Sequence, residues 1–277
     1  MELSEIFNYG FVQRAIIAGV LIAAICSLLG VFLVLRRFSL IGDGLAHITF
    51  GSVAVVLLIG ISPFYVTLAA LPIVMISSLV ILKLTSTKRI QGDAAIGIVS
   101  SIGIAAGIIL TSLSGGYNVD LFSYLFGNIL TVNQTELILS FIVFLIVVAT
   151  VIFFYHDLFA ITFDEELARS MGIKTKKINV ILFLLTALAA VLAMKVAGIM
   201  LVSAMLILPP LTALQLSISF RMTLIASLIF SVISVISGIM ISFLLNLPAG
   251  GTIVIMNVVF LLLVFGVKKI PAFTKVK

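Results

Sequence analysis

Asp43 and His47 are the residues of this sequence best suited to bind a metal ion. They lie four positions apart in the run GDGLAH (residues 42–47), and residues four apart on an α-helix share one face. A carboxylate and an imidazole are ligands that both Zn²⁺ and Mn²⁺ accept. The alternative is a structural pair that caps or pins the end of a helix, and the spacing alone leaves both interpretations open.

Asp93 is a third acidic residue that could reach the same region. It follows a basic segment that ends at Gly92, and it precedes an apolar stretch. Its depth would match that of Asp43 if the two helices start at the same surface. Asp93 is therefore a candidate third metal ligand, although an aspartate in this position is also a common helix N-cap.

Residues 162–172 (TFDEELARSMG) have the pattern of a short helix. Thr162 and Glu165 have the spacing of a capping box, and Gly172 is a typical helix stop. Acidic residues, which favour a helix N-terminus, fill the first turn, and Arg169 lies near the other end. The sequence therefore predicts one short helix over residues 162–172, within a hydrophilic connection.

This predicted helix is amphipathic. Its apolar side carries residues spaced four apart, which are Phe163, Leu167 and Met171. One alternative is that this side lies against lipid headgroups. Three adjacent acids at positions 164–166 disfavour contact with an anionic membrane surface. We therefore expect the helix to bind a protein partner.

The elements that must position these residues are helices in a membrane. Of the 277 residues, 63% are hydrophobic and 9% are charged, against roughly 45–50% and about 25% in soluble domains. This composition excludes a water-soluble enzyme, because a soluble domain of this length would expose many more charged residues. We expect one all-α domain over residues 1–277, a polytopic transmembrane helix bundle.

A membrane span needs ~20 mostly apolar residues, and the polar and Gly- or Pro-marked breaks leave about nine such stretches. They are Phe11–Leu35, Leu40–Gly60, Phe64–Leu84, Ala94–Leu113, Gln134–Tyr155, Ile178–Met194, Gly198–Leu216, Met222–Leu245 and Thr252–Val267. The division at Lys195 is the weakest, so eight or ten crossings are alternatives. Gly103 and Gly107, four residues apart, are expected to let two helices approach closely. The connection Ser114–Thr135 is expected to hold a short helix that lies at the interface or re-enters the bundle.

The basic residues predict the orientation. With the amino terminus outside and nine crossings, the inner side receives all the Lys and Arg residues except Arg14 and Lys195. The positive-inside rule favours this arrangement, which puts the carboxyl terminus in the cytoplasm. Lys195 is then expected at the outer surface, with its side chain extended toward water.

Several function classes are excluded by what the sequence lacks. It has no GxxxxGK[ST] motif and so cannot bind ATP in a P-loop. Its two histidines, His47 and His156, are too few for a multi-histidine zinc site. The basic residues cluster between apolar stretches, which argues against nucleic-acid binding. We therefore expect a transport subunit rather than an enzyme, with no permanently bound cofactor.

Five runs in the same order along the chain carry a family resemblance. They are LRRFSLIGDGLAHI (35–48), DAAIGIV (93–99), DLFSYLFGNILT (120–131), FDEELARSMGIK (163–174) and GIMLVSAMLILPPL (198–211). Together they resemble the membrane permease subunit of the ABC-3 type, from the ABC importers that take up zinc, manganese or iron. The resemblance implies the type II importer permease fold in a prokaryotic cell membrane.

The resemblance also implies partners and residue roles. Permeases of this family pair as homodimers, bind two cytoplasmic ABC ATPase subunits and receive metal from an extracytoplasmic metal-binding protein. The family's intramembrane Asp and His fall on Asp43 and His47, and Asp93 matches a family acid. The transported ion would be zinc or manganese, with iron as a further candidate. The short helix would be the coupling helix, with the ATPase-facing residues Phe163, Asp164, Glu165, Glu166, Leu167, Arg169 and Gly172.

Two other transport functions are alternatives. A proton-coupled secondary metal carrier would need no ATPase, but such carriers usually show repeated halves, and we find no repeat between residues 1–138 and the remainder. The second alternative is a permease for a metal chelate. Such a permease would need no Asp–His pair facing its pore, so the pair at Asp43 and His47 favours a metal-ion permease.

Overall fold

The computed structural model describes residues 10–62, 65–86, 92–113, 127, 132–199, 202–216 and 218–268. All regular elements in these ranges are helices. Eight of the described helices are long and apolar enough to cross a membrane, so the expected all-α membrane bundle is confirmed. Most of the connection Ser114–Thr135, where we expect a short interfacial or re-entrant helix, lies outside the described residues.

The long helices match the expected spans within a few residues at each end. They are α2 (Gly10–Leu35), α3 (Ile41–Leu58), α4 (Val66–Thr85), α5 (Gly92–Leu113), α7 (Gln134–Phe153), α10 (Thr175–Ala197), α12 (Phe220–Leu245) and α13 (Ala249–Lys268). The seventh expected span, residues 198–216, is the shorter apolar helix α11 (Val202–Gln215). Fourteen residues make a helix about 21 Å long, which is less than the ~30 Å of a bilayer core.

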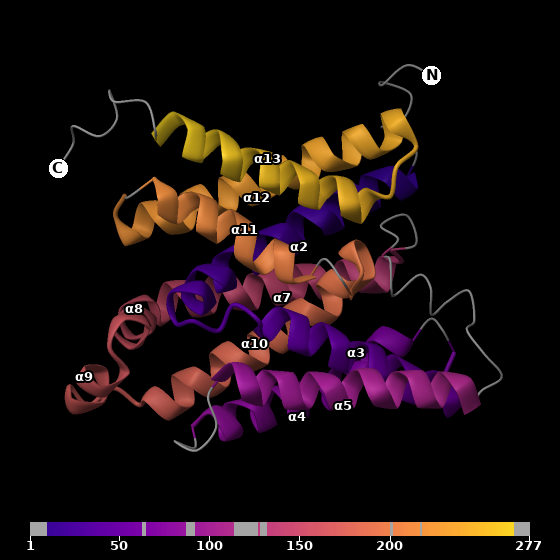
Figure 1. The fold of residues 1–277 in the computed structure, drawn as a ribbon, viewed down its shortest axis with the longest axis horizontal. Helices are drawn as coiled ribbons and strands as arrows, with labels where there is room; N and C mark the ends of the chain where they lie inside the picture. Colours follow the sequence, from indigo (N-terminus) through magenta and orange to yellow (C-terminus); the bar gives the residue numbers. More distant parts are fainter. Residues whose placement is uncertain are drawn as a thin grey trace.

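The long helices form a layered bundle (Figure 1), with α12 and α13 along one edge and α4 and α5 along the other. Helices α2, α3 and α10 bury 78%, 72% and 72% of their most apolar 18-residue windows, against 22–39% in the other five. The bundle is therefore centred on α2, α3 and α10.

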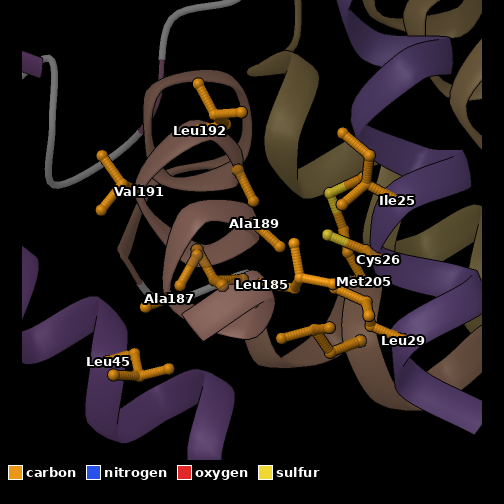
Figure 2. Close-up of a cluster of buried hydrophobic side chains, with 14 of the residues drawn as sticks. Ile25, Cys26, Leu29, Leu45, Leu185, Ala187, Ala189, Val191, Leu192 and Met205 are labelled. Atoms are coloured by element: carbon orange, nitrogen blue, oxygen red, sulfur yellow. The ribbon is translucent and has the colours of Figure 1, made fainter. Parts of the chain in front are cut away.

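The core is one continuous cluster of buried apolar side chains. Figure 2 shows part of it, where Ile25, Cys26 and Leu29 of α2 meet Met205 of α11 and Leu185 of α10. This packing fixes α2 and α10 relative to each other.

Helices α3 and α5 are held together by backbone contact between small residues. A Cβ added at Gly103 would lie 2.7 Å from Ile48 Cα, and one added at Gly51 would lie 2.5 Å from the Gly103 carbonyl oxygen. A Cβ at Gly107 would meet the Phe50 ring at 2.5 Å. The expected close approach at Gly103 and Gly107 is confirmed, and α3 cannot move along α5 without breaking these contacts.

Residues 155–170 form two short helices, α8 (Tyr155–Phe163) and α9 (Glu165–Ser170), which project at one end of the bundle (Figure 1). The expected single helix over 162–172 is therefore wrong, and so is its capping box. Thr162 lies in the last turn of α8, and its hydroxyl donates to the Leu158 carbonyl at 2.6 Å. Asp164 has extended backbone angles and caps α9 instead, accepting from the Leu167 N–H at 2.9 Å.

Gly172 ends α9 as the sequence predicts. Its φ is +86°, a conformation that glycine adopts without strain. The Gly172 N–H donates to the Arg169 carbonyl at 3.1 Å, and the Ile173 N–H donates to the Ala168 carbonyl at 3.1 Å. These two hydrogen bonds form a Schellman motif, which turns the chain sharply into α10.

Lys195 does not extend to the outer surface as expected. Its Nζ lies 3.3 Å from Oε1 of Glu136 on α7, and the two side chains are 15% and 7% exposed. A buried carboxylate thus offers the ammonium group a partner inside the bundle. That partner lies on a different helix, and the local sequence around Lys195 gives no sign of it.

Candidate metal-binding site

Asp43 and His47 lie one turn apart at the start of α3, on the same face. The His47 Nε2 and the Asp43 Oδ2 are 3.5 Å apart, and the side chains are 22% and 46% exposed. The shared face predicted from their spacing is therefore confirmed. Asp43 is in the first turn, where the positive end of the helix dipole stabilises a carboxylate.

The backbone that carries this pair is tightly enclosed. The neighbours Gly42, Gly44, Leu45 and Ala46 are buried. A Cβ at Gly44 would lie 2.5 Å from Ile96 Cγ2 on α5, and one at Gly42 would lie 2.6 Å from Leu206 Cδ1 on α11. The start of α3 is thus wedged between α5 and α11, while the polar face remains accessible.

The turn between α2 and α3 sets where this face begins. Arg37 has a φ of +61°, a left-handed conformation that is unusual for a side chain other than Gly or Asn. Its N–H donates to the Val34 carbonyl at 3.1 Å, and the Phe38 N–H donates to the Leu33 carbonyl at 2.9 Å. This Schellman motif ends α2 and directs the chain into α3. The sequence predicted the break between Leu35 and Leu40 but not this conformation, because a basic residue stands where glycine is usual.

Asp93 does not join the pair within one chain. It lies in the first turn of α5, and it is exposed. Among the described residues, no group of three or more His, Cys, Asp and Glu side chains is close enough to hold a metal ion. Among the described His, Cys, Asp and Glu residues, only Asp43 and His47 come together here, so water or another molecule would complete the coordination shell.

The three apolar residues predicted for one side of a single helix are exposed, but they do not share one helix: Phe163 ends α8, Leu167 lies in α9 and Met171 follows α9. Phe163, Leu167 and Met171 are 62%, 58% and 70% exposed, whereas Ala168 on the other side is buried. Large apolar side chains gathered at one end of a bundle are typical of an interaction surface.

Glu165 differs from the other acids of this segment because it points into the protein. Its carboxylate accepts hydrogen bonds from Arg36 at 2.9 Å and from Asn179 at 3.0 Å. From the sequence, Glu165 was expected on the surface that contacts the ATPase. Arg36 was used only to predict the orientation in the membrane, and no role was predicted for Asn179. The one signal in the sequence for this hydrogen bonding is Asn179, a polar residue within the apolar stretch of α10.

The chain is similar to known membrane transport proteins over most of its length. A model of the ABC 3 transport family matches residues 8–268. The chain is 36% identical over 251 residues to the manganese transport system membrane protein MntC of Halalkalibacterium halodurans, which covers 91% of this chain and 85% of the relative. It is 32% identical over 241 residues to the high-affinity zinc uptake system membrane protein ZnuB of Haemophilus influenzae, which covers 87% of this chain and 91% of the relative.

The fold is also found among solved structures. PsaBC from Streptococcus pneumoniae in complex with Fab has a chain that superposes with a TM-score of 0.83 at 30% sequence identity. The superposition covers 95% of this chain and 94% of that chain. The helix bundle is therefore shared over nearly the whole chain.

Proposed function

The chain belongs to the ABC 3 transport family, and we propose that Asp43 and His47 bind the transported divalent metal ion within its translocation path. The protein is the membrane permease subunit of a metal-ion importer, and ATP hydrolysis resides in a separate subunit. Both manganese and zinc systems occur among its relatives, and a carboxylate with an imidazole suits either ion.

The observation that carries this proposal is the position of the pair. An aspartate and a histidine lie 3.5 Å apart on the accessible face of a helix whose other residues are largely buried. Ionisable residues in membrane helices are costly and usually line a pathway. Two protein ligands completed by water also suit a cation that must leave again, because a closed cage of four ligands would retain it.

A second copy of the chain would face this site in the assembled importer. We place the translocation path between two permease subunits, with Asp43 and His47 of each exposed toward it. Asp93, exposed at the start of α5, would provide a further carboxylate toward the cytoplasmic side of this path. An extracytoplasmic metal-binding protein would deliver the ion to the opposite side.

The cytoplasmic partner would dock at α9. The exposed side chains of Phe163 at the end of α8, Leu167 in α9 and Met171 after α9 would enter a groove on each ABC ATPase, as amphipathic helices do. Asp164 and Glu166 would lie at the rim of that contact together with Arg169. With the eight long helices and the shorter α11 as the ninth crossing, the amino terminus would be outside the cell and the carboxyl terminus in the cytoplasm.

The test measures metal uptake by the complete importer, with its ATPase and binding protein, in proteoliposomes. Uptake of radiolabelled Mn²⁺, Zn²⁺ and Fe²⁺ is compared. Asp43→Asn and His47→Ala should each lower uptake of the transported ion at least about tenfold, while the permease still binds its ATPase. His156→Ala is the matched control, since His156 is the other histidine of the chain and lies on α8. Wild-type uptake by both Asp43 and His47 variants would refute the proposal.

A further inference from the structure

Arg36, Glu165 and Asn179 form a closed ring of hydrogen bonds. The Arg36 Nη1 donates to Asn179 Oδ1 at 2.8 Å, and Nη2 donates to Glu165 Oε2 at 2.9 Å. The ring closes where Asn179 Nδ2 donates to Glu165 Oε1 at 3.0 Å. Arg36 follows α2, Glu165 begins α9 and Asn179 lies in α10, so the ring joins the end of α2 to two consecutive helices that lie about 130 residues or more further along the chain.

The ring pairs the buried Arg36 with Glu165, whose Oε1 also lies 3.7 Å from Nη2 of the exposed Arg169. The Arg36 side chain is 8% exposed and the Glu165 side chain is 34% exposed. Burial lowers the pKa of the Arg36 guanidinium, and the charge of Glu165 and its hydrogen bond oppose that effect. A buried cation that loses its carboxylate is strongly destabilised. Arg36 therefore favours the arrangement in which Glu165, and α9 with it, stays in place.

Helix α9 has few other attachments. It is short, it begins at the extended residue Asp164, and it ends at the left-handed Gly172. It packs on α8 and α10, and the Arg36 side chain connects it to the end of α2. Leu167 on its outer side is exposed, and its inner side is anchored by the Glu165 carboxylate.

Arg36 also belongs to the turn that leads to Asp43. The Arg36 guanidinium lies over the Phe38 ring, 5.5 Å from its centroid, and Phe38 makes an edge-to-face contact with Phe183 of α10 at 5.4 Å. The turn continues into α3, whose first turn contains Asp43. A displacement of α9 that keeps the ring intact must therefore move this turn as well.

We propose that the Arg36–Glu165–Asn179 ring positions α9 against the α2–α3 turn, so that movement of α9 by the ATPase is transmitted to the start of α3 and its metal ligands. This inference rests on the proposed function, because it requires α9 to dock on the ATPase and Asp43 to bind the ion. The three ring residues are positioning residues, and none of them needs to contact the metal.

The ring can be broken and rebuilt by exchanging amide and carboxylate. Glu165→Gln alone places an amide NH₂ group against the NH₂ group of Asn179. Asn179→Asp alone places two carboxylates against each other. The double variant Glu165→Gln/Asn179→Asp restores all three hydrogen bonds and keeps one carboxylate beside Arg36, only on the other side of the ring.

The experiment measures ATP hydrolysed per metal ion taken up by the complete importer in proteoliposomes, together with ATPase assembly. Each single variant should assemble with the ATPase but raise this ratio at least about tenfold, the factor that corresponds to about 1.4 kcal/mol. The double variant should return to within about twofold of the wild type, the scatter expected of such cycles. A ring that only stabilised the fold would change yield and melting temperature without changing the ratio.

Asp157→Asn is the control, since it removes a carboxylate from the neighbouring helix α8 outside the ring, and it should leave the ratio unchanged. Arg36→Lys serves as a second variant that keeps the charge but cannot span both partners, and it should be uncoupled in the same way. Wild-type coupling in the single variants and in Arg36→Lys, or no recovery in the double variant, would overturn this inference alone. A wild-type importer that takes up no metal ion would overturn the proposed function and the inference together.

Discussion

Lys195 of α10 and Glu136 of α7 form an ion pair inside the helix bundle, with Nζ and Oε1 3.3 Å apart. The same carboxylate accepts from the Thr67 hydroxyl of α4 at 3.0 Å. It also closes a capping box with Asn133, which begins α7. One buried glutamate therefore joins three helices and caps one of them.

Removing this carboxylate should destabilise the bundle. Glu136→Gln leaves the Lys195 ammonium buried without that carboxylate, and breaking a buried pair by deleting one partner costs about 3 kcal/mol or more. Thermal unfolding in detergent should show a lower midpoint for this variant. The double variant Glu136→Gln/Lys195→Met removes both charges and should recover much of the loss. A double variant no more stable than Glu136→Gln would contradict a direct interaction.

The contact between α3 and α5 should not tolerate a side chain at Gly103. Gly103→Ala would bring a Cβ to 2.7 Å from Ile48 Cα, and overpacking of this kind typically costs 1–3 kcal/mol, here about 2 kcal/mol. Gly97→Ala on the same helix is the control, because a Cβ there meets nothing within 4 Å and alanine favours the helix. Unfolding midpoints should fall for Gly103→Ala and stay equal or rise for Gly97→Ala.

A charge on the apolar side of α9 should block the ATPase contact. Leu167 is 58% exposed, so Leu167→Asp should leave the fold in detergent intact while preventing assembly or uncoupling hydrolysis from uptake. Leu167→Met keeps an apolar side chain there and should assemble normally. Co-purification with the ATPase measures the difference. Normal assembly and uptake by Leu167→Asp would exclude this side as the docking surface.

The proposed orientation can be tested by labelling single cysteines in a Cys26→Ala background, since Cys26 is buried. A cysteine replacing Leu247, in the turn before α13, should react with an impermeant reagent added outside intact cells. A cysteine replacing Lys176, at the start of α10, should react only after permeabilisation. Both residues are exposed. Labelling of both from the same side would be incompatible with this topology.

The amino-acid sequence alone was sufficient for the features that depend on local periodicity. Stretches of ~20 apolar residues define the spans because the bilayer thickness sets the length of a helix. Asp43 and His47 share a face because four residues make about one helical turn. The close packing at Gly103 was also predictable, since only small residues let membrane helices touch.

The tertiary structure decided which polar side chains meet across helices. Glu165 is next to Asp164 and Glu166 in sequence, yet it points inward because Arg36 and Asn179 come from other helices and satisfy its carboxylate. Lys195 is likewise directed inward by Glu136. Such pairs have no local signature, because a buried charge must find its partner wherever the packing brings one within hydrogen-bond distance. The packing of apolar surfaces sets those distances, and no spacing within a single helix encodes them.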